Sequence, residues 1–251
     1  IKNYYLLIKE RKMKKQTTLI FAVTFINTFI FCQDPESLLE EANIKMKLGQ
    51  LDLADSLLQL SIKSDPSFAP AHVGFSELWL RKGDLNKSAE SATRAVQMDE
   101  DFRSWWNSLN DIRNNIQNGR RYIQEGQYEQ AINEYSTISE KFPYFPEAQF
   151  YIGLTKFRQK DIKSAAFHFS EALKIYPGHI KARKGLNNVT KQFLNNGNKA
   201  YKRGDLEKAL NYYQDAVSYD DQFYLAFYQL GVLEKKMGNA DMAITYLNKA
   251  I

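Results

Sequence analysis

The stretch at residues 119–143, GRRYIQEGQYEQAINEYSTISEKFP, decides the fold, because its pattern of glycine, aromatic residue and alanine recurs along the chain. Within it Gly126 precedes Ala131 by five residues, and five of six equivalent positions have a glycine at this spacing. The small residues of this register follow one another after 34, 43, 34, 44 and 34 residues: Ala54, Ser88, Ala131, Ala165, Ala209 and Ala243. Self-similarity near 34 residues is typical of helical solenoids, in which each unit packs on its neighbours.

Each unit has the pattern of two helices joined by a turn. Apolar residues recur at helical spacing, and a glycine interrupts them near the middle of five units, where a helix end often needs a left-handed backbone. Pro66, Pro143 and Pro177 cannot continue the second helices and therefore end them. We predict an all-α solenoid with units at residues 35–68, 69–102, 112–145, 146–179, 190–223 and 224–251.

These features resemble the tetratricopeptide repeat family over residues 35–251. The family signature has small residues at positions 8, 20 and 27, glycine at 15, and proline at 32. The fourth unit departs from it, because Lys160 stands where the turn glycine is expected. The resemblance implies a right-handed superhelix, in which small residues at positions 8 and 20 allow the two helices of a unit to approach closely. The third unit shows the signature as Gly119, Tyr122, Gly126, Tyr128, Ala131, Tyr135 and Pro143.

The two long intervals point to additional residues at 103–111 and 180–189. Neither stretch contains proline, and only Gly185 could break a helix. We predict that they lengthen the first helices of the third and fifth units to more than about 20 residues. A short separate helix followed by a kink is the alternative.

The beginning of the chain is similar to an export signal. Basic residues follow Met13, an apolar run covers residues 19–31, and Cys32 precedes a polar stretch. We expect cleavage after Cys32 and a periplasmic or envelope-associated location in a bacterium, with residues 1–12 an extension of the reading frame. An uncleaved leader that anchors the chain, or lipid on Cys32, would be the membrane-bound alternatives, and the sequence favours neither.

The net charge of +5 belongs to this leader rather than to the repeats. The first 32 residues hold six Lys/Arg and one Glu, so the remainder has 34 − 6 = 28 basic and 29 − 1 = 28 acidic residues. A neutral array disfavours nucleic-acid binding, which needs clustered positive charge.

The sequence contains no motif of an enzyme, a metal site or a cofactor site. We expect His168 to be packed or at the rim of the core, and His179, which follows Pro-Gly, to be solvated. Large aromatic residues at repeat positions favour the core for Trp79 and Trp106. Their neighbour Trp105 is the better surface candidate.

The resemblance implies a concave groove lined by the first helices, which takes an extended peptide or a partner helix. Its apolar and aromatic residues interleaved with Arg and Lys suit an apolar or acidic segment. The alternative is that part of this surface is packing between neighbouring helices. The same register also includes Met46, Leu80, Arg113 and Ile116. The groove residues by this register are Asn43, Glu77, Arg120, Phe150, Phe157, Arg158, Asn198, Tyr201, Lys202 and Tyr228.

We therefore expect an exported, non-enzymatic scaffold that binds a peptide or protein partner in its groove. Ile251 falls in the middle of a second helix, and solenoids need a terminal cap. We thus expect the natural chain to continue. The alternative function is a substrate-presenting or targeting region of a larger protein with a catalytic or cell-wall-binding domain beyond Ile251.

Overall fold

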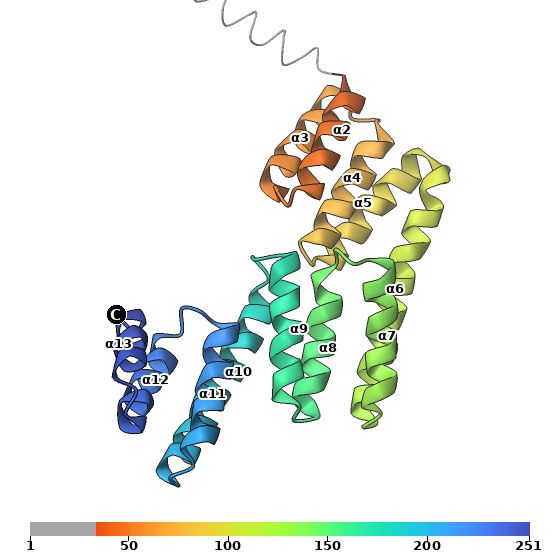
Figure 1. The fold of residues 1–251 in the computed structure, drawn as a ribbon. Coiled ribbons are helices and arrows are strands. Elements are labelled where there is room, and N and C mark those ends of the chain that lie inside the picture. Colours follow the sequence, from red (N-terminus) through yellow and green to blue (C-terminus); the bar gives the residue numbers. More distant parts are fainter. Residues whose placement is uncertain (1–33) are drawn as a thin grey trace, which may run out of the picture. The chain divides into compact units, whose positions relative to one another are not determined.

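The computed structural model describes residues 34–251 as an array of helices (Figure 1). The export signal predicted at residues 13–32 and the extension at residues 1–12 lie outside this range. The described residues form two compact units: residues 34–78 with Ser88–Trp106, and Trp79–Lys87 with Asn107–Ile251.

Successive helices form antiparallel pairs, as expected for an α-solenoid, and the predicted fold class is confirmed. The helices α4, α5 and α6 contribute residues to both units. The helices of the described residues are α2 (Pro35–Lys47), α3 (Leu51–Ser64), α4 (Ala69–Arg81), α5 (Leu85–Met98), the short η1 (Glu100–Phe102), α6 (Arg103–Gln124), α7 (Tyr128–Lys141), α8 (Pro146–Arg158), α9 (Ile162–Ile175), α10 (Ile180–Lys202), α11 (Leu206–Tyr219), α12 (Tyr224–Met237) and α13 (Ala240–Lys249).

The turns within the repeats have the left-handed backbone that the glycine pattern predicts. All five turn glycines have φ between 72° and 87°, and Lys160 adopts φ 64° at the sixth turn. Asp161, the next residue, accepts a hydrogen bond from the backbone N–H of Ser164 at 3.1 Å and so caps α9. A left-handed residue followed by an aspartate thus ends one helix and begins the next.

The helices of a repeat touch where the register places small residues. Ala54, Ala131 and Ala165 are fully buried. A Cβ added at Gly119 would lie 2.5 Å from the ring of Tyr135, and one at Gly197 would lie 2.4 Å from the ring of Tyr213. The ring of the second helix therefore packs directly on the backbone of the first, and only glycine leaves space for it.

Two helices exceed the usual repeat length. The helix α6 has 22 residues and α10 has 23, and each runs unbroken through the stretch that lengthens the interval between repeats. Gly185 lies inside α10 without interrupting it, and a Cβ there would meet the ring of Phe169 at 2.8 Å. None of the helices between Pro35 and Lys249 combines the length and the apolar character needed to cross a membrane.

Two tyrosines at the same repeat position are expected to differ in how their hydroxyl groups affect stability. Burial raises the pKa of Tyr135 and of Tyr213 to about 12, so both hydroxyls are neutral at physiological pH. The Tyr213 hydroxyl donates to Asn198 Oδ1 at 2.7 Å, whereas the buried Tyr135 hydroxyl has no hydrogen-bond partner within residues 34–251. We expect Tyr213→Phe to destabilise the fold by about 1 kcal/mol and Tyr135→Phe to be neutral or stabilising, because only the first loses a hydrogen bond.

Urea denaturation of the two variants, followed by circular dichroism, measures this difference. Each variant controls for the other, because both remove one hydroxyl from the same repeat position. A loss of stability in Tyr135→Phe equal to that in Tyr213→Phe would contradict the expectation.

Candidate ligand-binding pocket

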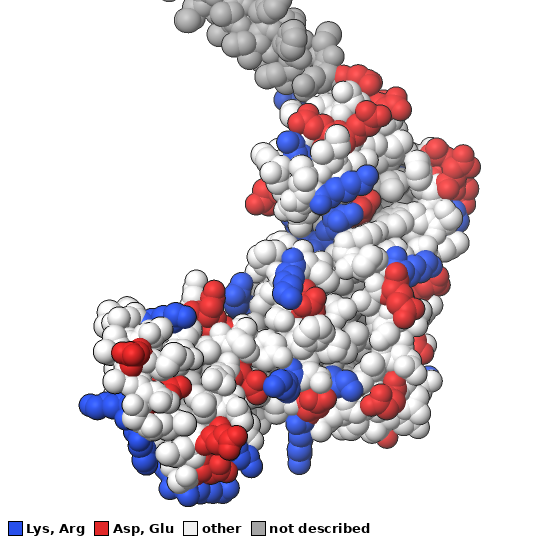
Figure 2. All heavy atoms as spheres, viewed as in Figure 1, with Lys and Arg blue, Asp and Glu red and all other residues white. Residues whose placement is uncertain are grey.

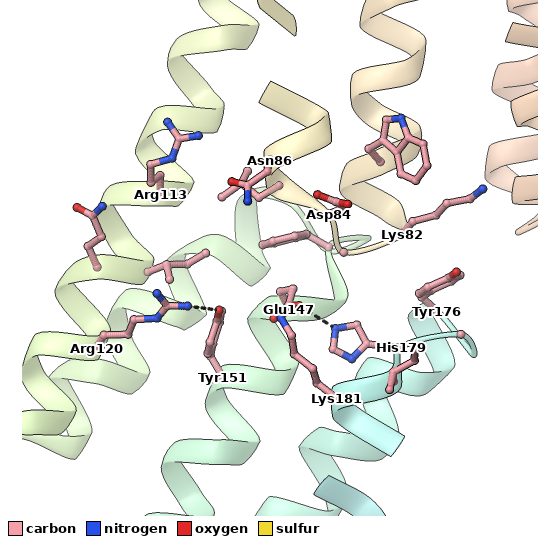
Figure 3. Close-up of a pocket in the computed structure, with 18 residues that line it drawn as sticks. Lys82, Asp84, Asn86, Arg113, Arg120, Glu147, Tyr151, Tyr176, His179 and Lys181 are labelled. Carbon is pink, nitrogen blue, oxygen red and sulfur yellow. Dashed lines mark hydrogen bonds and ion pairs between the residues drawn. The ribbon is translucent and has the colours of Figure 1, made fainter. Parts of the chain in front are cut away.

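A pocket of about 700 Å³ lies within the second unit. Four segments form it: the turn between α4 and α5, one face of α6, the first two turns of α8, and the beginning of α10 (Figure 3). The side chains around it are both charged and aromatic. They include Trp79, Lys82, Asp84, Asn86, Arg113, Ile116, Gln117, Arg120, Phe145, Glu147, Tyr151, Tyr176, His179 and Lys181.

Glu147 is the buried charge of the pocket. Its side chain is 7% exposed, and its Oε1 lies 2.8 Å from Lys181 Nζ and 3.3 Å from His179 Nε2. Burial alone would raise the pKa of the Glu147 carboxyl, but hydrogen bonds from His179 and Lys181 and the charge of Lys181 outweigh it and lower the pKa. The carboxylate is therefore ionised at neutral pH and holds the Lys181 ammonium at the pocket.

His179 is buried, so the expectation that it is solvated is wrong. Its ring is 5% exposed, and Nδ1 accepts a hydrogen bond from the Ala182 backbone N–H at 3.0 Å, which caps α10. In the neutral ring the proton then lies on Nε2, facing Glu147. A Cβ at Gly83 would meet the His179 ring at 3.2 Å, so the turn between α4 and α5 covers this histidine.

The helix α6 supplies two arginines to the other side of the pocket. Arg120 donates to the Tyr151 hydroxyl at 2.7 Å, and its guanidinium lies 5.4 Å from the centre of the Tyr151 ring. That ring stacks on Tyr135, with 5.1 Å between ring centres. Arg113 donates to Asn110 Oδ1 at 3.1 Å. Packing of Tyr135 in the repeat core thus helps to orient Arg120, because Tyr135 stacks on Tyr151 and Tyr151 accepts the hydrogen bond from Arg120.

The pocket carries net positive charge although the array as a whole is neutral. Four cations line it, namely Lys82, Arg113, Arg120 and Lys181, against the two carboxylates of Asp84 and Glu147, which gives 4 − 2 = +2. On the face shown in Figure 2, by contrast, basic and acidic residues are interspersed. A cleft with an excess of one charge attracts ligands of the opposite charge.

Only one of the ten predicted groove residues, Arg120, lines this pocket. Phe157 and Arg158 lie together in a separate hollow of about 470 Å³. Phe150 packs against the core around Phe169, and Asn198 accepts the hydrogen bond from Tyr213, so both serve packing.

The other groove residues are more dispersed. Asn43 and Glu77 are half-buried in the first unit. The Lys236 ammonium lies 4.5 Å from the centre of the Tyr201 ring, while Lys202 and Tyr228 are exposed. Of the other residues in the groove register, Met46 and Leu80 are buried, which contradicts a place on the groove surface and agrees with packing between helices. Arg113 and Ile116, in contrast, line the pocket together with Arg120.

The tryptophans differ from expectation, because none is fully buried. Trp79 lines the pocket, with the Lys87 ammonium 4.1 Å from the centre of its ring. Trp106 is half-buried and donates to the Thr93 hydroxyl at 3.1 Å. Trp105, the surface candidate, is also half-buried and donates to the buried Ser76 hydroxyl at 2.8 Å.

His168 is half-buried, and its Nδ1 lies at hydrogen-bond distance, 2.8 Å, from Gln149 Oε1, which confirms its place at the rim of the core.

The family comparison agrees with the repeat architecture. Tetratricopeptide repeat models match residues 116–180 and residues 224–251. Residues 116–180 and 224–251 are therefore tetratricopeptide repeats by these matches, within a chain of repeated helix pairs. No curated protein matches its sequence.

Several solved structures match this chain at low sequence identity. Pseudomonas aeruginosa PilF is 17% identical with a TM-score of 0.34, over 84% of this chain and 88% of that chain. The tetratricopeptide repeat protein YrrB, described as having an unusual peptide-binding site, is 18% identical with a TM-score of 0.29, over 77% of this chain and 90% of that chain. The type IV pilus biogenesis factor PilW is 17% identical with a TM-score of 0.30, over 84% of this chain and 90% of that chain.

The ion pair of Glu147 predicts a dependence of stability on pH. Because the folded-state pKa of Glu147 is lowered from its ordinary 4.5, its contribution to stability is present above that pH and is lost as the pH falls through the folded-state pKa. Glu147→Gln should lower the unfolding free energy at pH 7 by about 1–3 kcal/mol, the usual range for losing a buried, charge-assisted hydrogen bond. The difference from the native chain should shrink toward pH 3.

Thermal unfolding of both proteins between pH 3 and 8 tests this dependence. Glu129→Gln is the matched control, because Glu129 pairs with Lys156 but is 72% exposed, and such surface pairs contribute little. A Glu147→Gln deficit that stays constant over the whole pH range would refute the linkage.

Proposed function

We propose that this tetratricopeptide-repeat array is a non-enzymatic scaffold that binds a partner protein through a peptide segment seated in the pocket of the second unit. Its repeats belong to a family of protein-interaction scaffolds. The observation that carries the proposal is the pocket itself, about 700 Å³ in volume, with a net charge of +2 and aromatic side chains beside the cations. Such a lining suits an acidic segment with apolar neighbours.

Aromatic side chains give the pocket apolar surface for such a segment. Trp79, Phe145, Tyr151 and Tyr176 come from three of its four sides, and aromatic residues commonly anchor protein interfaces. The groove residues outside the pocket, among them Phe157, Tyr201 and Tyr228, would extend the contact along α8, α10 and α12. In this proposal the pocket holds the anchor of the partner, and those residues contact its flanks.

The proposal predicts binding that depends on Arg120. An array of acetylated, amidated ten-residue peptides of mixed sequence, probed with the purified chain, should select peptides rich in Asp and Glu. Arg120→Glu should weaken binding of the selected peptides at least about tenfold, or about 1.4 kcal/mol, because it places a carboxylate against the acidic ligand.

The matched control is Arg121→Glu, because Arg121 is the adjacent exposed residue of α6 and is not part of the pocket lining. It should change the affinity by less than about twofold, the effect expected of a peripheral charge. An array on which no peptide binds above background, or equal losses in the two variants, would reject the pocket as the peptide site.

We also propose that the array is exported and functions in a bacterial periplasm or cell envelope. The basic residues after Met13, the apolar run at residues 19–31 and the polar stretch after Cys32 support this location. Expression of the full chain in a bacterium should yield a mature protein whose mass corresponds to a start at Gln33, recovered from the periplasmic fraction. A cytoplasmic protein that retains residues 13–32 would contradict export, whereas a retained leader in the membrane fraction would indicate an anchor.

A further inference from the structure

The two arginines of α6 are spaced so that they select for a particular ligand geometry. Arg113 and Arg120 are seven residues apart, and Ile116 and Gln117 between them also line the pocket. Spacings of three, four and seven residues lie on one face of a helix. At 1.5 Å per residue the two arginines are about 10.5 Å apart along the axis of α6.

Both guanidinium groups keep free hydrogen-bonding capacity. Each makes one hydrogen bond to a neutral oxygen, Arg113 to Asn110 and Arg120 to Tyr151, and each has five N–H donors in total. Neither forms an ion pair with a carboxylate among residues 34–251. Lys181, in contrast, is already paired with Glu147 at 2.8 Å. The two arginines are therefore the cations of the pocket that are best placed to bind external carboxylates.

The spacing of the arginines restricts the conformation of a peptide that reaches both. A polyproline II segment rises about 3.1 Å per residue and has three residues per turn, so side chains three residues apart lie on one face about 9.3 Å apart. In a β-strand, residues three apart point to opposite faces, and residues two apart are only about 6.8 Å apart. The polyproline II spacing is therefore closer than the strand spacing to the rise between the two arginine positions along α6, and it keeps both carboxylates on one face.

A helical ligand is the alternative. Carboxylates seven residues apart on a helix would also match the distance of about 10.5 Å, but a short peptide forms two isolated helical turns only at a large entropic cost. A polyproline II segment is narrower and also loses less conformational entropy on binding, because it is a major conformer of unfolded chains.

We propose that the pocket recognises an acidic peptide segment in polyproline II conformation, with two carboxylate side chains three residues apart, one bound by Arg113 and the other by Arg120. This inference rests on the proposed function and adds the sequence pattern of the ligand. Arg–carboxylate pairs can be bidentate, so each arginine also fixes the direction of its carboxylate.

The test starts from the tightest acidic peptide of the array. Fluorescein-labelled derivatives of that peptide carry two glutamates either adjacent or two, three, four or seven residues apart, with glutamine at all other acidic positions. The peptide with a spacing of three should bind at least about fivefold more tightly than the other four. Proline at both residues between the glutamates should retain or increase the affinity, because it favours polyproline II.

Variants of the protein then assign the two contacts. Arg113→Gln and Arg120→Gln should each abolish the advantage of the spacing of three, because one remaining arginine can bind only one carboxylate at a time. Arg121→Gln is the matched control, with the same change of charge on the same helix, and should preserve the advantage. Thermal unfolding of the three variants shows whether each remains folded.

The outcomes separate this inference from the proposed function. Peptides that bind with equal affinity at all spacings, or most tightly at a spacing of two or seven, would overturn the inference and leave peptide binding in place. A loss of affinity when proline replaces the two residues between the glutamates would also overturn it. So would tighter binding of a single-stranded oligonucleotide of equal charge. If no peptide binds at all, the proposed function fails as well.

Discussion

The structure depends on how closely the two helices of each repeat can approach. In the third to sixth repeats, glycine at position 8 leaves the backbone of the first helix open, and the ring or branched side chain at position 24 fills this space. Gly119 with Tyr135 and Gly197 with Tyr213 are the clearest cases, because an added Cβ would lie 2.4–2.5 Å from the ring. A methyl group at either glycine would force the two helices apart and disrupt the packing of the next repeat, since each repeat buries its apolar face on its neighbour.

The same contact reaches the candidate pocket through a series of packed side chains. Gly119 allows Tyr135 to lie against α6, Tyr135 stacks on Tyr151 of α8, and the Tyr151 hydroxyl accepts a hydrogen bond from Arg120. Tyr151 thus holds Arg120, and the repeat core holds Tyr151 in turn. Arg120 itself is exposed to solvent. Orientation by a rigid neighbour lowers the entropy that an arginine loses when it binds a ligand. The repeat core therefore determines the geometry of the charged site.

The sequence predicts the repeats well, because their small residues and turns recur locally at fixed spacing. It predicts the site poorly, because the pocket brings together segments about 30 residues apart along the chain. His179 follows Pro-Gly, a context typical of an exposed turn, but the turn at Gly83 and the carboxylate of Glu147 cover it. Glu147 lies in the first helix of the fourth unit, and the family resemblance assigns first helices to the groove, whereas Lys181 falls in the additional stretch at residues 180–189. The sequence did not indicate their pairing, since it requires the packing of α8 against the start of α10.

The two extended helices account for the excess of positive charge in the pocket. Arg113 and Arg120 lie on the long helix α6, and Lys181 lies at the start of the long helix α10. The α10 cation is matched by Glu147, which is buried and therefore needs the hydrogen bonds from Lys181 and His179 to remain ionised. The α6 cations have no such carboxylate among residues 34–251, and they retain their charge at the pocket surface. A buried carboxylate that neutralises one side of the pocket thus leaves the electrostatic attraction concentrated on the other, along a single helix face.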